Sequence, residues 1–468
     1  MVFTSLHFVA FFAVVYAVYR VVPLRAQNWL LLVASYYFYA AWDWRFASLI
    51  IGSTLVDYFV AHAIARADDP QRRRYLLWSS LAFNFGMLGF FKYFNFFADS
   101  LVAAFAVLGW HASPVTLHVV LPIGISFYTF MTVSYVVDVY RGDIPPTDSL
   151  LDFAVFVAYF PHLVAGPILR ASLLLPQIHS ARRISRVQIG EGLWLLAWGL
   201  FLKVFVADNL AHVVDAVYGG GASPGGGDVL IATWAFAFQI FGDFAGYSNM
   251  ARGMSKLMGI ELNVNFRFPY FVTSPQEFWR HWHISLSTWL RDYLYIPLGG
   301  SRGSSLATAR NLLVTMVLGG LWHGAAWTFV IWGLYQGAVL VGARAVAAVG
   351  RPVTAAWQRA CLMILVFHVT CYGWLIFRAQ SAGQIVDFTG LLFSGSGWIG
   401  AATSMHLTTL LLIVLPLLLV HVYQASRDDE LAVLQLPRPV RYAIVGGVGY
   451  LVLLFGDFEG AEFIYFQF

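Results

Sequence analysis

The chain has 468 residues, of which 59% are hydrophobic and only 11% are charged. Soluble domains carry about a quarter charged residues, so this composition excludes a water-soluble globular protein and predicts that lipid surrounds most of the chain. The formal net charge of +4, with arginines in short loops, argues against a nucleic-acid partner and for membrane-orientation signals.

Hydrophobic stretches with few charges recur from end to end and predict an all-α polytopic membrane protein with roughly a dozen transmembrane helices. The first stretch, 2–19, has no basic leader or small-residue cleavage site, so we expect it to be retained. The others are 26–42, 46–65, 75–97, 101–137, 151–169, 190–213, 229–250, 311–343, 358–377, 388–424 and 440–456. The whole chain, 1–468, is expected to form one membrane domain, with arginine-rich loops in the cytoplasm and the N-terminus outside.

Residues 251–310 are too polar to cross lipid, yet they are rich in aromatic side chains. We expect an interfacial or re-entrant region in which Ser274 caps a helix, Pro275 takes its first position and Glu277 follows three residues after the cap. If this helix is continuous, its helical period places one apolar stripe on a single face. The stripe consists of Trp279, Trp282, Leu286, Trp289, Leu290 and Tyr293.

Most of the thirteen histidines need no functional explanation. Isolated ones, for which we expect an interfacial position or a satisfied helix contact, are His7, His62, His111, His118, His179, His212, His368, His406 and His421. The pair His281 and His283 could supply two metal ligands from a strand, but on a helix the two point nearly opposite ways. No cysteine or HExxH pattern is nearby, so we predict no metal site, with His281 near solvent or headgroups and His283 turned into the protein.

His323 lies in "LGGLWHGAAW", 12 residues into the charge-free run 311–343. On one continuous span that is roughly 18 Å, about half the depth of the hydrocarbon core. An ionisable group at that depth normally faces the protein interior or a water-filled cavity.

Three glycines, Gly319, Gly320 and Gly324, bracket this histidine and permit a helix break or a close approach. Two interpretations of the histidine stay open. It either hydrogen-bonds across two helices, or it acts as a neutral general base that deprotonates a hydroxyl group.

At these residues the sequence resembles a known family. "FWRHWHISLSTWLRDYLYIPLGGSR" and "RNLLVTMVLGGLWHGAAWTFVIWGLYQG", with "FPHLVAGPILR" and "FGDFAGYSNMARGMSKLMGIELNVNFRFPY", are similar to motifs of the membrane-bound O-acyltransferase (MBOAT) family. The similarity is to its bacterial branch of alginate O-acetyltransferase type and covers most of 1–345.

The resemblance implies helices around a central tunnel, in a multi-pass protein of the bacterial inner membrane. It implies acetyl transfer from a cytoplasmic thioester, acetyl-CoA or another, with no bound cofactor. The acceptor would be an alginate-like exopolysaccharide, reached through a periplasmic acetyltransferase. The catalytic histidine would be His323, in segment 311–345, and the second characteristic polar position would be His283.

Other residues in matching motifs are candidates for substrate or tunnel contact, although packing or helix capping is the simpler role for the polar ones. They are Trp322, Trp279, Trp282, Tyr247, Ser248, Asn265, Asp243 and Arg267. The chain departs from the usual "SGYSDM" by carrying Ala245 and Asn249, which removes one charge.

The alternatives are the same chemistry on cellulose or peptidoglycan, D-alanyl transfer to teichoic acid, a transporter or channel, and a lipid-binding scaffold. A transporter predicts repeat symmetry with paired interrupted segments, whereas this chain has a single dense motif region.

Overall fold

A computed structural model describes residues 1–110, 117, 120–163, 166–220, 223–349, 355–395, 397–460 and 463–464. Within these ranges all regular secondary structure is helical, as the composition predicts. The chain divides into two compact units, one of Met1–Ser185 with Ser255–Leu262 and one of Arg186–Met254 with Asn263–Phe468. The expectation of one membrane domain stays a prediction.

Eight stretches in the described part of the chain are long and apolar enough to cross a membrane, which confirms a multi-pass membrane protein. They are Leu24–Arg66, Pro70–Val107, Arg186–Tyr218, Gly226–Leu257, Trp327–Ala348, Ala356–Arg378, Ala401–Arg427 and Arg438–Phe455. The number is lower than a dozen partly because some expected spans are short helices. Stretch 151–169, for example, contains α7 (Leu150–Ala158) and α8 (Phe160–Leu163), and both are largely buried.

The first unit is held together by buried polar contacts between helices. Asp57 on α3 accepts hydrogen bonds from Ser80 and Asn84 on α4, and Asn28 on α2 donates to Asp152 on α7 at 2.7 Å. Hydrogen-bonded polar groups of this kind fix helix pairs where no water is present. The other helices of this unit are α1 (Leu6–Tyr19), α2 (Leu24–Asp43), α3 (Ala47–Arg66), α4 (Pro70–Leu88), α5 (Phe94–Val107), α6 (Ile125–Arg141) and α9 (Ala171–His179).

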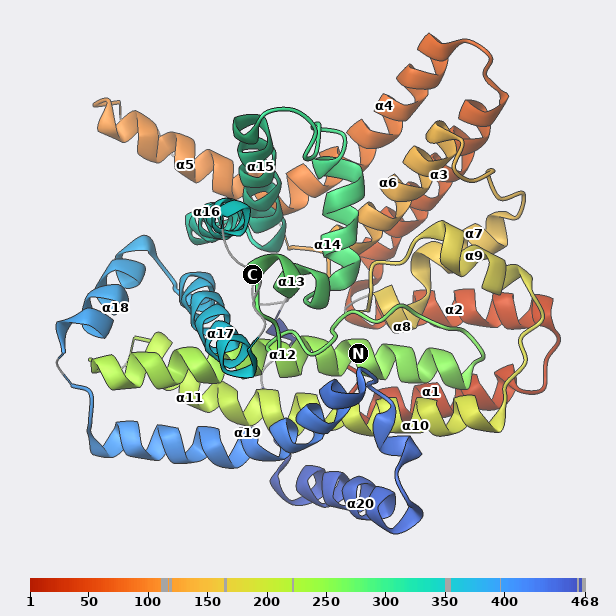
Figure 1. Ribbon diagram of the computed structural model, residues 1–468. Helices are drawn as coiled ribbons and strands as arrows, with labels where there is room; N and C mark the ends of the chain where they lie inside the picture. The colour runs from red at the N-terminus through yellow and green to blue at the C-terminus, as the bar shows by residue number, and fades with distance from the viewer. Residues whose placement is uncertain are drawn as a thin grey trace. The chain divides into compact units, whose positions relative to one another are not determined.

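The second unit contains the longest helix, α12 (Gly226–Leu257), whose last turn belongs to the first unit. Figure 1 shows α10 and α11 following one another along one line, with α19 beside α11 and α20 packed on α10. The remaining helices are α10 (Arg186–Leu200), α11 (Asp208–Tyr218), α13 (Pro275–His281), α14 (Ile284–Leu290), α15 (Ser305–His323), α16 (Trp327–Val349), α17 (Ala356–Arg378), α18 (Ala382–Ser394), α19 (Ala401–Arg427) and α20 (Arg438–Phe455).

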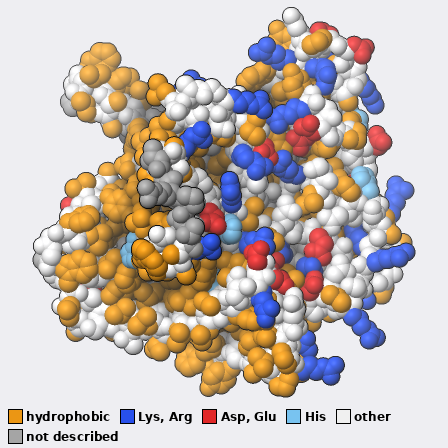
Figure 2. Space-filling view, viewed as in Figure 1, with side chains coloured by type: hydrophobic (Ala, Val, Ile, Leu, Met, Phe, Trp, Pro, Cys, Tyr) orange, Lys and Arg blue, Asp and Glu red, His pale blue; other side chains and the backbone are white. Residues whose placement is uncertain are grey.

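Hydrophobic side chains are exposed along α19 and α20, as helices in contact with lipid require. Leu412 is 66% exposed and Leu453 is 79% exposed. Figure 2 shows such side chains spread over the region of α18, α19 and α20.

Two glycine contacts bring helices of the second unit into close approach. A methyl group on Gly320 of α15 would lie 2.2 Å from the carbonyl oxygen of Phe329 and 3.2 Å from the Cα of Gly333, both on α16. A methyl group on Gly199 of α10 would lie 2.6 Å from the carbonyl oxygen of Gly246 on α12. Only residues without a Cβ allow backbones to pack this closely.

Candidate active site

The aromatic segment begins as predicted and then breaks. Ser274 caps α13 by accepting a hydrogen bond from the Glu277 backbone N–H at 3.2 Å, and Pro275 takes the first position. The prediction of one continuous helix is wrong, because α13 ends at His281 and α14 starts at Ile284. Between them His283 has φ 42° and ψ 55°, a left-handed conformation that costs energy for a residue with a Cβ.

Asn265 holds His283 in this conformation. Its backbone oxygen accepts from the Ile284 N–H at 2.9 Å, and its side-chain oxygen accepts from both the backbone N–H and the hydroxyl of Ser285. The same Oδ1 lies 3.2 Å from Nδ1 of His283, while the Asn265 amide donates to the Ser248 hydroxyl at 3.3 Å. All four side chains are buried.

These contacts define the protonation state of His283. The backbone N–H of Ser285 can only donate, so the Asn265 atom that it meets is the carbonyl oxygen, and Nδ1 of His283 must carry a proton to bond to the same oxygen. In the neutral ring the lone pair is then on Nε2. Burial lowers the pKa of His283 well below its usual range, and the nearby His323 lowers it further, so the ring is neutral near pH 7.

His323 is the last residue of α15, and Gly324 ends the helix in an extended conformation. The charge-free run 311–343 therefore forms two helices, α15 and α16, with a turn between them, and the depth of His323 in the bilayer stays a prediction. The His323 side chain is 5% exposed, and its ring lies 5.1 Å from Trp332 and 5.4 Å from Phe377 in edge-to-face contacts.

The Trp322 ring lies close to both histidines. Its ring centroid lies 5.1 Å from that of His323 and 5.9 Å from that of His283. Phe244 on α12 covers another side of His283, at 4.5 Å. The structure thus brings together two residues that are 40 positions apart in the sequence (323 − 283).

A cavity of about 180 Å³ opens beside His323. Its walls are mainly apolar, and its polar lining includes Ser287, Thr315 and the half-exposed Arg291. The other lining residues are Trp279, Leu286, Leu290, Tyr295, Leu312, Met316, Gly319, Trp332 and Leu340. Trp279 lines this cavity, while its contact with a substrate and the expected tunnel stay predictions.

Trp282 and Trp322 are almost fully buried and form aromatic walls behind the histidines. Trp282 lies 4.9 Å from Phe266 and 4.8 Å from Trp374. Of the motif residues, Ser248 and Asn265 are thus connected to His283 through hydrogen bonds.

Asp243 and Tyr247 belong to a different cluster. Asp243 pairs with Lys203 at 2.8 Å and accepts a hydrogen bond from the backbone N–H of Ile464, while Lys203 also pairs with Asp208 at 2.7 Å. Tyr247 lies under the Lys203 ammonium group at 5.8 Å. This buried ion-pair cluster supports the packing interpretation of both residues. The sequence analysis did not single out Lys203.

Asn249 and Arg267 also have structural partners. Asn249 accepts a hydrogen bond from Arg252, which pairs with Glu430, so the departure from the usual motif keeps a hydrogen-bonding role. Arg267 pairs with Asp428 at 2.7 Å in an exposed position.

A further histidine without a predicted role, His162, is a fully buried ring of the first unit that contacts the Phe156 carbonyl at 3.2 Å. Across the described ranges no group of three or more histidine, cysteine or acidic side chains could hold a metal ion.

Comparison with known proteins agrees with this geometry. Residues 229–382, which contain both histidines, match the model of the membrane-bound O-acyltransferase family. The chain is 42% identical over 420 residues to the probable alginate O-acetylase AlgI of Azotobacter vinelandii, covering 88% of this chain and 83% of that protein. It is 36% identical to the peptidoglycan O-acetyltransferase of Helicobacter pylori, covering 77% and 72%. It is 28% identical to the teichoic acid D-alanyltransferase of Streptococcus thermophilus, covering 47% and 56%.

The family match and the relatives identify this multi-pass membrane protein as an O-acyltransferase. The chain belongs to the membrane-bound O-acyltransferase family.

Proposed function

We propose that this protein transfers an acetyl group from a thioester donor toward the hydroxyl groups of an exopolysaccharide, with His323 as the general base. The observation that carries the proposal is the position of His323, a buried imidazole at a helix end that lines a cavity large enough for a small acyl group. A positioned histidine contributes about 10² to 10⁴ to the rate of such a proton transfer.

In the proposed step the acceptor hydroxyl gives its proton to His323 as its oxygen attacks the thioester carbonyl carbon. The tetrahedral intermediate then collapses, the new ester bond remains, and the thiolate leaves and takes the proton back from the imidazolium. His283 donates its Nδ1 proton to Asn265, which fixes the ring, and in this proposal the ring stabilises the imidazolium of His323.

The cavity lining supports a donor with an apolar arm and a phosphate. The cavity has the volume of about six water molecules at roughly 30 Å³ each. This is room for an acetyl thioester and the adjoining part of the donor's arm. Arg291 stands in the lining with its side chain 58% exposed and paired with Asp292 at 2.6 Å, and the remaining donors of its guanidinium suit a phosphate. Acetyl-CoA is such a donor.

The relatives favour one acceptor over the others. The alginate O-acetylase matches over more of the chain and at higher identity than the D-alanyltransferase does, which favours acetyl transfer to an alginate-like polymer. Peptidoglycan is the second candidate, because the peptidoglycan enzyme also matches over most of the chain. Cellulose stays an alternative acceptor. A transporter or channel is disfavoured because the family performs acyl transfer.

A polymer acceptor is too large for a cavity of this size, so we further propose that a periplasmic acetyltransferase receives the acetyl group. This places the protein in the bacterial inner membrane, between a cytoplasmic donor and an external acceptor.

The test is acetyl transfer from radiolabelled acetyl-CoA by the purified protein in lipid nanodiscs, together with the acceptor polymer and its periplasmic partner. His323→Ala should abolish labelled product while its thermal unfolding midpoint stays that of the native protein. The control is His7→Ala, which removes an exposed histidine of α1 and should leave transfer unchanged. Normal transfer by a folded His323→Ala protein would refute the assignment.

A further inference from the structure

A second cavity, of about 260 Å³, lies in the second unit between α12, the segment 268–271, α17 and α19. Its walls are formed almost entirely by apolar and aromatic side chains, and two histidines complete them. The lining residues are Phe238, Phe241, Phe268, Pro269, Tyr270, Phe271, Met363, Ile364, Phe367, His368, Leu417, Leu418 and His421. None of them is among the residues that line the cavity at His323.

His421 gives this cavity its chemical character. Its side chain is 7% exposed, and within the described residues it makes no hydrogen bond. Its neighbours are aromatic rings, with centroids at 5.3 Å for Phe241, 5.8 Å for Phe268 and 5.8 Å for Trp198. Buried polar side-chain atoms nearly always have a hydrogen-bond partner, so a buried imidazole that faces an apolar cavity indicates a ligand with a polar group.

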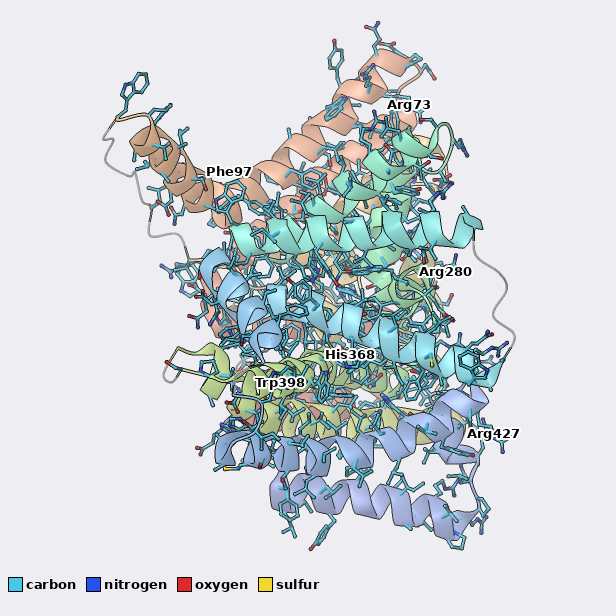
Figure 3. All side chains as sticks on the ribbon, turned by 60° about the vertical axis from the view of Figure 1, so that its left-hand side comes forward. Arg73, Phe97, Arg280, His368, Trp398 and Arg427 are labelled. Carbon is cyan, nitrogen blue, oxygen red and sulfur yellow. The ribbon has the colours of Figure 1, made fainter. Side chains whose placement is uncertain are left out.

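The cavity opens to the lipid-facing surface of the unit. Ile364, in its lining, is 61% exposed. His368 on the same face of α17 bonds to the Ile364 carbonyl of its own helix at 2.8 Å and is exposed (Figure 3). A ligand that enters here comes from the bilayer.

The depth of His421 specifies which part of a lipid it meets. It lies six residues (427 − 421) before Arg427, the last residue of α19, which Figure 3 labels. That is roughly 9 Å along the helix axis. A 27-residue helix is about 40 Å long, close to the full bilayer thickness with its headgroup regions. His421 is therefore near the boundary of the hydrocarbon core, the level of the ester groups of glycerolipids.

We propose that this cavity binds one acyl chain of a membrane glycerolipid, whose ester carbonyl accepts a hydrogen bond from the imidazole N–H of His421. The volume of this cavity corresponds to about nine heavy atoms at roughly 30 Å³ each, the volume of a water molecule in the liquid. Nine heavy atoms make up a segment of a single acyl chain. The site is separate from the acyl-transfer step and does not depend on the proposed function. Its ligand stays bound and is not a substrate.

The test uses the full chain in nanodiscs and a phosphatidylethanolamine that carries a diazirine midway along one acyl chain. Photolysis should label peptides that line the cavity, around Met363 and Leu418. Competition then compares unlabelled phosphatidylethanolamine with its ether-linked analogue, which has the same chains but no ester carbonyl. In the native protein the ester lipid should compete roughly threefold to tenfold better, the effect of one hydrogen bond.

In His421→Phe, which keeps an aromatic ring of similar size, the two lipids should compete equally. Leu412→Phe adds a ring to the lipid-facing surface of the same helix outside the cavity, and it should retain the native preference. Labelling only outside the cavity would overturn the proposal. Equal competition by ester and ether lipids in the native protein would also overturn it, because the cavity would then hold only an apolar chain or detergent. An ester preference that persists in a folded His421→Phe would overturn it as well.

Discussion

Gly320 sets the distance between α15, which carries His323, and α16, and Gly320→Ala tests whether this distance matters. The added Cβ would lie 2.2 Å from the Phe329 carbonyl oxygen, whereas ordinary contact starts at 3.4 Å. The helices must therefore separate by about 1.2 Å (3.4 − 2.2) or rearrange. Forcing an extra methyl group into a tight contact costs about 1–3 kcal/mol, and a shift of about 1 Å in a reacting group can lower the rate by about 10².

We expect Gly320→Ala to unfold at a lower temperature than the native protein in the same detergent and to transfer acetyl groups about 10²-fold more slowly. The matched control is Gly342→Ala on α16, where nothing lies within 4 Å of an added methyl group. The control should unfold at the native temperature or higher, because alanine favours a helix over glycine by about 1 kcal/mol. Native stability and native activity in Gly320→Ala would refute the close-approach reasoning.

Two further predictions concern the polar groups of the site. Asn265→Asp keeps an acceptor for Nδ1 of His283 but adds a negative charge, which raises the pKa of His283 from its depressed value. The acid limb of its pH–rate profile should therefore lie at higher pH than in the native protein, and an unchanged profile would contradict the proposed contact. His283 has a lower pKa in the native fold than in the unfolded chain, so the unfolded chain binds more protons below pH of about 6.5. The free energy of unfolding should therefore keep the contribution of His283 above that pH and lose it as the pH falls. Arg291→Ala should raise KM for acetyl-CoA about tenfold with little change in kcat. Arg302→Ala, which changes an exposed arginine, should leave KM unchanged. An unchanged KM in Arg291→Ala would contradict the proposed contact between Arg291 and a donor phosphate.

The sequence predicts those parts of the site that depend on local chemistry. The cap at Ser274 and the inward position of His283 are confirmed. Both could be predicted because side-chain capping and burial patterns are encoded within a few residues. The apolar stretches are confirmed as helices in most places, because membrane helices require long apolar segments.

The break at His283 could not be predicted in the same way. A left-handed histidine has no propensity signal, and its conformation depends on Asn265, which lies 18 positions earlier. The turn after His323 was hard to place, because a charge-free run has no charged residue to mark where one helix ends. The helix ends at His323, and Gly324 follows it in an extended conformation.

Burial of isolated histidines is also a tertiary property. His421 was expected to have an interfacial position or a satisfied contact, and only the fold reveals its aromatic neighbours and the cavity beside it. Likewise Lys203 lies in a hydrophobic stretch, and only the fold brings Asp208 and Asp243 to it.

The most direct test of the account is a structure of the protein with a non-hydrolysable acetyl-CoA analogue, from which the distance between the acetyl carbonyl carbon and the His323 imidazole is measured. We predict that the acetyl end occupies the cavity lined by Gly319 and Trp332, with room for one hydroxyl oxygen between this carbon and the ring. An analogue bound with its acetyl group away from that cavity, in a protein that remains active, would contradict the assignment of His323 as the base.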